Sequence, residues 1–150
     1  ETMRTPHRDA LDTSSIARTL AIVGDRWSFL ILRSAFRGIH RFDDFQDDLG
    51  IGRGVLADRL RKLVEAGVLC KVPYQERPLR YEYRLSAAGT ELSPALVALM
   101  FWGDRHLADS CGPPTVLVHR PCGTEFEQGF WCATCAKRFK PNEISSRPAS

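Results

Sequence analysis

Long apolar runs are absent from the sequence, and so is a strong excess of charge of one sign. The longest apolar stretches, such as residues 96–102, are far too short to span a bilayer, and no basic segment followed by an apolar stretch opens the sequence. We therefore expect a cytoplasmic protein with no membrane partner. The sequence also lacks an internal repeat, a glycine-rich phosphate loop and a recognisable pair of nucleophile and base, so we expect no enzymatic activity.

What is present is typical of a globular protein. The 150 residues are 43% hydrophobic and 26% charged, which excludes a disordered chain, a collagen-like repeat and a coiled-coil rod. The length allows one domain with a real core and a small appendage. The net charge of +3, from 21 basic and 18 acidic residues, neither requires nor excludes a nucleic-acid partner. The position of the charge is therefore more informative than its sum.

Apolar periodicity divides the first hundred residues into helices, and a glycine ends each of the first four. The clearest helix repeats Leu56, Leu60 and Leu63 ahead of Gly67, and Ser14 or Ser15 is the expected cap of the first helix. Two alternating runs joined by a proline-containing connection predict a β-hairpin. The predicted helices cover residues 16–23, 27–36, 42–49, 53–66 and 94–107, and the predicted strands cover 68–73 and 80–85.

Three helices followed by a hairpin, with a further helix at each end, is the order of elements in a winged helix-turn-helix. The last of the three helices, here residues 53–66, enters the DNA major groove in that fold. The expected fold is mainly α with a β-hairpin wing. A Gly-Pro-Pro break at 112–114 marks the end of this domain. The predicted organisation is a flexible arm (1–13), a winged-helix DNA-binding and dimerisation domain (14–110), a cysteine-rich extension (111–144) and a flexible tail (145–150).

Basic charge is concentrated in the fourth helix and the hairpin. Residues 53–84 contain 8 basic and 4 acidic side chains, a net charge of +4 against +3 for the whole chain. Opposite the leucine stripe, the small residues Gly54 and Ala57 would let the helix backbone approach base edges, and Arg59 could reach a phosphate. Arginine-rich helix faces are usually solvated surface, and Arg61 and Glu65 have the spacing of a simple i, i+4 ion pair.

Several ordered motifs resemble one family. They are IARTL at 16–20 with VGDRW at 23–27, LILR at 30–33, RFDDF at 41–45, LxxRLRxLxxxG at 56–67 and PLRYEYxLxxxG at 78–89. Together, over residues 14–108, they resemble the HxlR-type transcriptional regulators, which are related to the MarR-like winged-helix proteins. The resemblance implies a homodimer that binds an inverted-repeat operator on double-stranded DNA. We expect a sequence-specific regulator, a repressor that responds to a small molecule or a stress signal.

Carried over to this sequence, the resemblance implies which residues meet DNA and which meet a second copy. The residues that would face the major groove are Arg53, Ala57, Asp58 and Arg61. Arg59 would face the DNA backbone, and the wing would face the minor groove or its phosphates. The expected DNA-binding residues are Arg41, Arg53, Gly54, Ala57, Asp58, Arg59, Arg61, Lys62, Arg77 and Arg80. The expected dimer interface is formed by Ile16, Leu20, Leu96, Leu99, Met100 and Trp102, although these apolar stripes could instead pack within one chain.

One position departs from the family pattern. Many family members carry a cysteine just before the first helix, and some use it as an electrophile or redox sensor, whereas this sequence has Ser14. A hydroxyl has no reactive thiolate form. Either the protein senses its signal in another way, or Ser14 is not the native residue. Trp27 and the second helix are candidates for an effector pocket, but they are equally compatible with core packing.

Four of the five cysteines lie between Cys111 and Cys135, which favours metal or redox chemistry over a disulfide framework. The spacing H-x₂-C, nine residues, C-x₂-C is that of the two ligand turns of a zinc ribbon. We predict a zinc-ribbon-like extension with a closed structural Zn²⁺ site, and a short hairpin within 124–131. The expected ligands are His119, Cys122, Cys132 and Cys135, with Cys111 as a possible substitute for His119.

Alternatives to this site remain open. The thiols could be unliganded or redox-active, and the protein could be a zinc- or thiol-based redox sensor or an interaction module whose basic face is incidental. Cys70 lies in a predicted strand, where we expect a small buried hydrophobic residue. His40 and His106 have no partner at ligand spacing.

Overall fold

The computed structural model describes residues 14–147, and the chain divides between Leu96 and Val97 into two compact units. The division falls inside a helix, upstream of the domain boundary that the sequence predicts at 110/111. The predicted arm at 1–13 and positions 148–150 of the predicted tail lie outside the described residues. None of the helices among residues 14–147 is long and apolar enough to cross a membrane.

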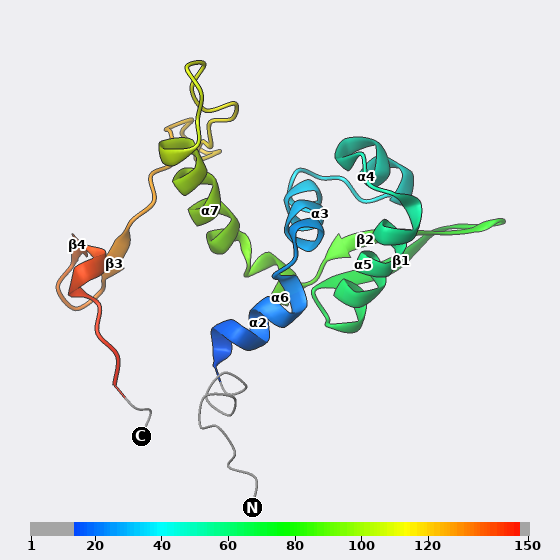
Figure 1. Ribbon diagram of the computed structural model, residues 1–150, viewed down its shortest axis with the longest axis horizontal. Helices are drawn as coiled ribbons and strands as arrows, with labels where there is room; N and C mark the ends of the chain where they lie inside the picture. Colours follow the sequence, from blue (N-terminus) through cyan, green and yellow to red (C-terminus); the bar gives the residue numbers. More distant parts are fainter. Residues whose placement is uncertain (1–13, 148–150) are drawn as a thin grey trace, which may run out of the picture. The chain divides into compact units, whose positions relative to one another are not determined.

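Four helices open the first unit (Figure 1): α2 (Ser15–Val23), α3 (Arg26–Phe36), α4 (Phe42–Leu49) and α5 (Arg53–Glu65). Their bounds agree with the sequence prediction to within one residue. Ser14 caps α2, and the Asp25 carboxylate caps α3 by accepting the backbone N–H groups of Trp27 and Ser28 at 3.0 and 3.1 Å. Gly50 ends α4 in the left-handed conformation, with φ of 60°. Because only glycine adopts this conformation readily, the chain can turn directly into α5.

The core lies where α3, α4 and α5 meet. Leu56, Leu60 and Leu63 of α5 are fully buried, as the leucine periodicity predicts, together with Phe45 of α4 and Ile31 of α3. Burying each of these side chains contributes roughly 1.5–3 kcal/mol of transfer free energy. One face of α5 is therefore fixed in the core, and the opposite face is left to solvent.

The hairpin consists of β1 (Leu69–Glu76) and β2 (Leu79–Leu85), which pair antiparallel with Leu69 opposite Leu85 and Glu76 opposite Leu79. It extends away from the helices (Figure 1). Both strands are longer than predicted, because backbone pairing continues through the charged tip, where no apolar alternation exists. At the base of the hairpin, Tyr83 donates its backbone N–H to the His40 carbonyl at 2.7 Å. This bond ties the wing to the loop that precedes α4.

The prediction that Cys70 is buried is wrong: its side chain is exposed on β1. One face of the two-stranded sheet, with Leu69, Tyr83 and Leu85, packs against the core, and Cys70 lies on the opposite face, where no residue of the described chain covers it. After the hairpin, the short helix α6 (Ala87–Thr90), which the sequence did not predict, is capped by the Ser86 hydroxyl through the Gly89 N–H. Four residues are too few to show helical periodicity.

The helix α7 (Ser93–His106) passes from the first unit into the second. Within the second unit, Phe101 of α7 stacks on Phe126 with ring centroids 6.3 Å apart. Val118 and Glu125 form a β-bridge, and a hairpin of β3 (Phe130–Cys132) and β4 (Lys137–Phe139) follows, before the 3-10 helix η1 (Pro141–Glu143). None of residues 97–147 is fully buried.

The hairpin predicted within residues 124–131 is wrong. The chain instead reverses at the two ligand turns themselves: one reversal lies between Val118 and Glu125, and the other lies between β3 and β4. The tight turns occur where a residue with positive φ follows the second ligand position, at Gly123 and Ala136. These turns, and not the segment that joins them, therefore reverse the chain.

Candidate nucleic-acid interface

The exposed face of α5 is the first element of the site. Gly54 and Ala57 are exposed, and a Cβ built on Gly54 would meet nothing within 4 Å. The buried Leu56 and Leu60 on the other side of the helix hold this face outward. The helix backbone can therefore approach a partner closely at positions 54 and 57, which is the geometry that a recognition helix needs in the major groove.

Charged side chains surround these small residues and are paired with one another. Asp58 lies 2.8 Å from Arg61 and 3.0 Å from Lys62, and Arg61 lies 2.8 Å from Glu65, as its i, i+4 spacing predicts. Hydrogen bonds from Lys62 and Arg61 lower the pKa of the Asp58 carboxyl below its usual value. Because all four side chains are substantially exposed, solvent screens these pairs and they are weak, so a phosphate can replace the acidic partners.

Arg59 is placed differently from the other basic residues of α5. Its side chain is only 26% exposed, and its Nε lies 3.1 Å from Oδ1 of Asp25, the cap of α3. The Nε–Asp25 contact is an ion pair without hydrogen-bond alignment, and one terminal nitrogen of the guanidinium binds Asp58 at 3.2 Å. Burial opposes ionisation of Asp25, but hydrogen bonds from Ser28, the charge of Arg59 and the Trp27 N–H hold its pKa below the ordinary value. Arg59 thus ties α5 to α3, and its predicted phosphate contact stays a prediction.

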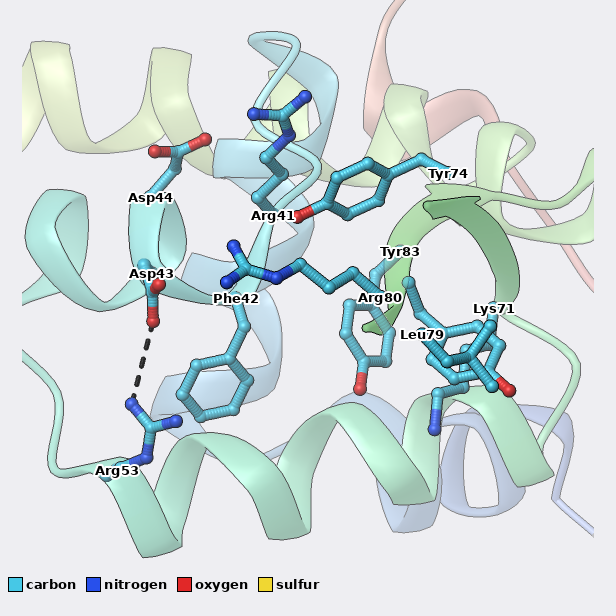
Figure 2. Close-up of a pocket in the computed structure, with 11 residues that line it drawn as sticks. Arg41, Phe42, Asp43, Asp44, Arg53, Lys71, Tyr74, Leu79, Arg80 and Tyr83 are labelled. Carbon is cyan, nitrogen blue, oxygen red and sulfur yellow. Dashed lines mark ion pairs between the residues drawn. The ribbon is translucent and has the colours of Figure 1, made fainter. Parts of the chain in front are cut away.

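A pocket of about 490 Å³ lies between α5, the start of α4 and the wing (Figure 2). Its wall combines four cations and two carboxylates with aromatic rings from both strands. Figure 2 shows Arg80 extending from β2 toward α4. The lining residues are Arg41, Phe42, Asp43, Asp44, Arg53, Lys71, Tyr74, Leu79, Arg80, Tyr81 and Tyr83.

Aromatic rings hold three of the four pocket cations. The Arg41 guanidinium lies 4.5 Å from the centre of the Tyr74 ring, Arg53 lies 4.8 Å from that of Phe42, and the Lys71 ammonium lies 4.4 Å from that of Tyr81. Stacking orients these charges without neutralising them. Arg53 also pairs with Asp43 at 3.5 Å, the dashed line in Figure 2, but both side chains are more than 70% exposed. The pocket therefore presents net positive charge to solvent.

The structure brings most of the expected DNA-binding residues to one region and adds residues that the sequence did not single out. Arg41, Arg53 and Arg80 meet at the pocket, whereas Arg77 is exposed at the wing tip. Lys71 and the tyrosine rings were missed. The signal that could have found them is the alternation along the strands, which places Lys71 opposite Tyr83. Trp27 does not line this pocket and packs against the core, so its effector role stays a prediction.

The expected dimer residues divide into exposed and packed groups. On α2, Ile16 and Leu20 are 73% and 52% exposed, and on α7, Leu99 and Trp102 are 55% and 52% exposed. Leu96 instead packs against the core of the first unit, and Met100 is half-buried. Leu96 thus packs within one chain, which was the alternative to a dimer contact. The other side chains leave large apolar groups of both helices in solvent.

The expected zinc ligands lie in two pairs. His119 Nδ1 is 3.2 Å from Cys122 Sγ, and the Cys132 sulfur is hydrogen-bonded by Cys135. Cys111 is exposed and donates its backbone N–H to Asp109. Within residues 14–147, no three His, Cys, Asp or Glu side chains form one group arranged to hold a single ion. The structure therefore shows each ligand turn but not a completed site.

Comparisons with known proteins agree with this geometry. The sequence pattern of the HxlR-like helix-turn-helix family matches residues 22–110. The chain is 43% identical over 134 residues to the HTH-type transcriptional regulator Rv3095 of Mycobacterium tuberculosis, covering 89% of this chain and 85% of the relative.

Two solved structures are also similar. The transcription factor PA1607 superimposes with a TM-score of 0.83 at 35% identity, covering 97% of this chain and all of that one (100%). The redox regulator HypR in its reduced form gives a TM-score of 0.58 at 27% identity, covering 63% of this chain and 96% of that one. The chain therefore belongs to the HxlR-like helix-turn-helix family and is a transcriptional regulator with a helix-turn-helix DNA-binding domain.

Proposed function

We propose that the protein is a dimeric, sequence-specific repressor that binds an inverted-repeat operator. In each copy, α5 lies in the major groove and the wing lies along the flanking backbone. One observation carries this proposal: the open face of α5 at Gly54 and Ala57 lies beside a pocket lined by four cations. The first feature suits base edges and the second suits phosphates, and the fold places them next to each other.

The pocket between α5 and the wing is the proposed seat of a backbone phosphate. Arg41, Arg53 and Arg80 come from three different elements, so a phosphate held among them would fix both the depth of α5 in the groove and the angle of the wing. Arg53 would exchange its solvent-exposed partner Asp43 for the phosphate. The exchange costs little because an exposed ion pair contributes only about 0.2–1 kcal/mol.

Dimerisation is proposed through α2 and α7, whose exposed apolar side chains a second copy would cover. A two-fold axis would then present two recognition helices to half-sites one helical turn apart, which is roughly 34 Å or 10 base pairs. Such a dimer reads an inverted repeat because its own symmetry matches that of the operator.

The proposed inducing signal is a small molecule or a stress condition. The similar protein HypR is a redox regulator. In this chain Ser14, the N-cap of α2, stands where many family members carry a cysteine that some of them use as a sensor. If Ser14 is native, a thiol-reactive signal must act elsewhere in the chain. Repression is tested with a reporter gene behind the operator: deletion of the regulator should raise expression, and a fall would identify an activator.

The DNA-binding proposal is tested by fluorescence anisotropy on an inverted-repeat duplex selected from genomic fragments. Arg53→Ala with Arg80→Ala should weaken binding and lower the slope of log K against log salt by about 0.9 for each phosphate that is no longer neutralised. Arg147→Ala, which removes one positive charge from the second unit, is the matched control and should change neither. An unchanged salt slope in the double variant would contradict the assigned interface.

A further inference from the structure

Two turns in the second unit have the same backbone form. In each, two candidate ligands separated by two residues are followed by a residue with positive φ, Gly123 at 69° and Ala136 at 50°. Among residues 14–147, Ala136 is the only residue other than glycine with positive φ. A side chain in this conformation is strained, so surrounding structure has to hold it. Ala136 therefore adopts a strained backbone conformation at the position in the second turn that Gly123 occupies in the first turn.

The first turn holds its two ligand atoms close to the separation that a metal requires. Backbone bonds from Cys122 and Gly123 to the His119 carbonyl, at 3.1 and 2.8 Å, close the turn. The result places His119 Nδ1 3.2 Å from Cys122 Sγ. Bond lengths of about 2.0–2.1 Å to nitrogen and 2.3 Å to sulfur at a tetrahedral zinc ion put these two atoms about 3.6 Å apart. The turn therefore needs to open by only a few tenths of an ångström.

The sulfur atoms of both turns are hydrogen-bonded within their own turn. The Cys122 thiol lies 3.2 Å from the Thr124 hydroxyl, and the Cys132 sulfur is hydrogen-bonded by Cys135. Hydrogen bonds of this kind orient the ligands of a metal site.

The described part of the second unit has no buried hydrophobic core. None of its described residues is fully buried, and Trp131 and Phe130, between the two turns, are 62% and 46% exposed. A segment with so little core depends on another source of stability, for which a structural metal is a common solution. Three thiolates and an imidazole select Zn²⁺ over the harder cations Mg²⁺ and Ca²⁺.

We propose that the two turns close on a single structural Zn²⁺ ion, one per chain, held by His119, Cys122, Cys132 and Cys135. Each turn supplies one edge of the tetrahedron, and the nine residues from Gly123 to Trp131 form the connection that lets the second turn fold onto the first. The three thiols release their protons to solvent as the ion binds. The four protein ligands leave no open position, so the ion is structural and not catalytic.

The full chain, purified without chelators from zinc-supplemented cells, tests the proposal by elemental analysis. One zinc per chain is expected. Cys122→Ser and Cys132→Ser should each lower the zinc content at least fivefold, whereas the matched controls Cys70→Ser and Cys111→Ser should keep it. His119→Cys, which preserves a ligand, should bind zinc where His119→Ala does not. Circular dichroism confirms that the first unit of each variant is folded.

Other results would overturn the proposal. These are a metal-free protein, iron in place of zinc, a disulfide between Cys132 and Cys135 in freshly purified protein, or loss of zinc in Cys111→Ser. Two complementary double variants test whether one chain holds the whole site. One carries His119→Ala with Cys122→Ser, and the other carries Cys132→Ser with Cys135→Ser. If mixing them restores zinc binding, the ion lies between two copies and the single-chain site is wrong. The proposal does not depend on DNA binding, which is measured separately.

Discussion

Asp25 offers the sharpest test of how α5, the proposed recognition helix, is positioned. The carboxylate caps α3 through two backbone N–H groups, accepts the hydroxyl of the buried Ser28 and faces Arg59 of α5. Replacing it with alanine removes a helix cap, worth about 0.5–2 kcal/mol, and leaves the buried Ser28 hydroxyl without its acceptor, at a cost of about 1–3 kcal/mol. The ion pair adds less than about 1 kcal/mol because Asp25 is 36% exposed.

We therefore expect Asp25→Ala to lower the free energy of unfolding by about 2–4 kcal/mol, because these separate costs overlap. Asp25→Asn keeps a capping oxygen and should lower it by about 1 kcal/mol. The measurement is urea unfolding followed by circular dichroism, at several protein concentrations because a dimer makes apparent stability depend on concentration. Asp47→Asn, at an exposed carboxylate of α4, is the matched control.

The same variants predict a pH dependence. Folding lowers the pKa of Asp25, so the stability that its charge contributes is complete above its unfolded pKa of about 3.9 and is lost as the pH falls through the lower folded value. The difference between wild type and Asp25→Asn should therefore be constant near neutral pH and shrink below about pH 4. Equal destabilisation by Asp25→Asn and Asp25→Ala would refute the argument, because charge and not capping would then dominate.

Three further changes test separate parts of the fold, and a fourth tests the dimer. Leu60→Ala should cost about 2–5 kcal/mol in urea unfolding, because a fully buried side chain leaves a cavity, and a loss under about 1 kcal/mol would contradict the core. Gly89→Ala should prevent folding, as judged by circular dichroism, because its Cβ would lie 2.1 Å from the Val68 carbonyl oxygen. Gly54→Ala should instead raise stability by up to about 1 kcal/mol while weakening operator binding, and undiminished binding would place α5 farther from the bases. Leu20→Glu should convert a dimer to a monomer in sedimentation, unless the interface lies elsewhere.

The sequence predicted the helices well because their signals are local. The leucines of α5 recur on one face, and Gly50 and Gly67 end their helices with positive φ, so both the type and the bounds of these elements follow from neighbouring residues. The same reasoning placed the cap of α2 at Ser14 or Ser15, and the structure shows that it is Ser14.

The pairings across the site could not be predicted in this way. Nothing near Arg59 in the sequence indicates that Asp25, more than thirty positions earlier, caps the neighbouring helix and faces its guanidinium. The pocket has the same character, because Arg41, Arg53 and Arg80 meet only once the wing is tied to the loop before α4. The prediction that Cys70 is buried was wrong for a related reason: alternation predicts a strand but does not show whether a second layer covers it.

The two units therefore depend on different sources of stability. In the first unit, the leucines of α5 and their neighbours Ile31 and Phe45 form a closed core, so α5, the proposed recognition helix, is positioned by contacts within that unit. The second unit has no fully buried residue in its described part, and it exposes Trp102 and Trp131. The proposed metal ion and the proposed second copy would each add stability to this unit. If the proposed dimer forms through α2 and α7, loss of that support should reduce operator affinity by weakening the dimer, while the proposed contacts of each α5 with its own half-site remain intact.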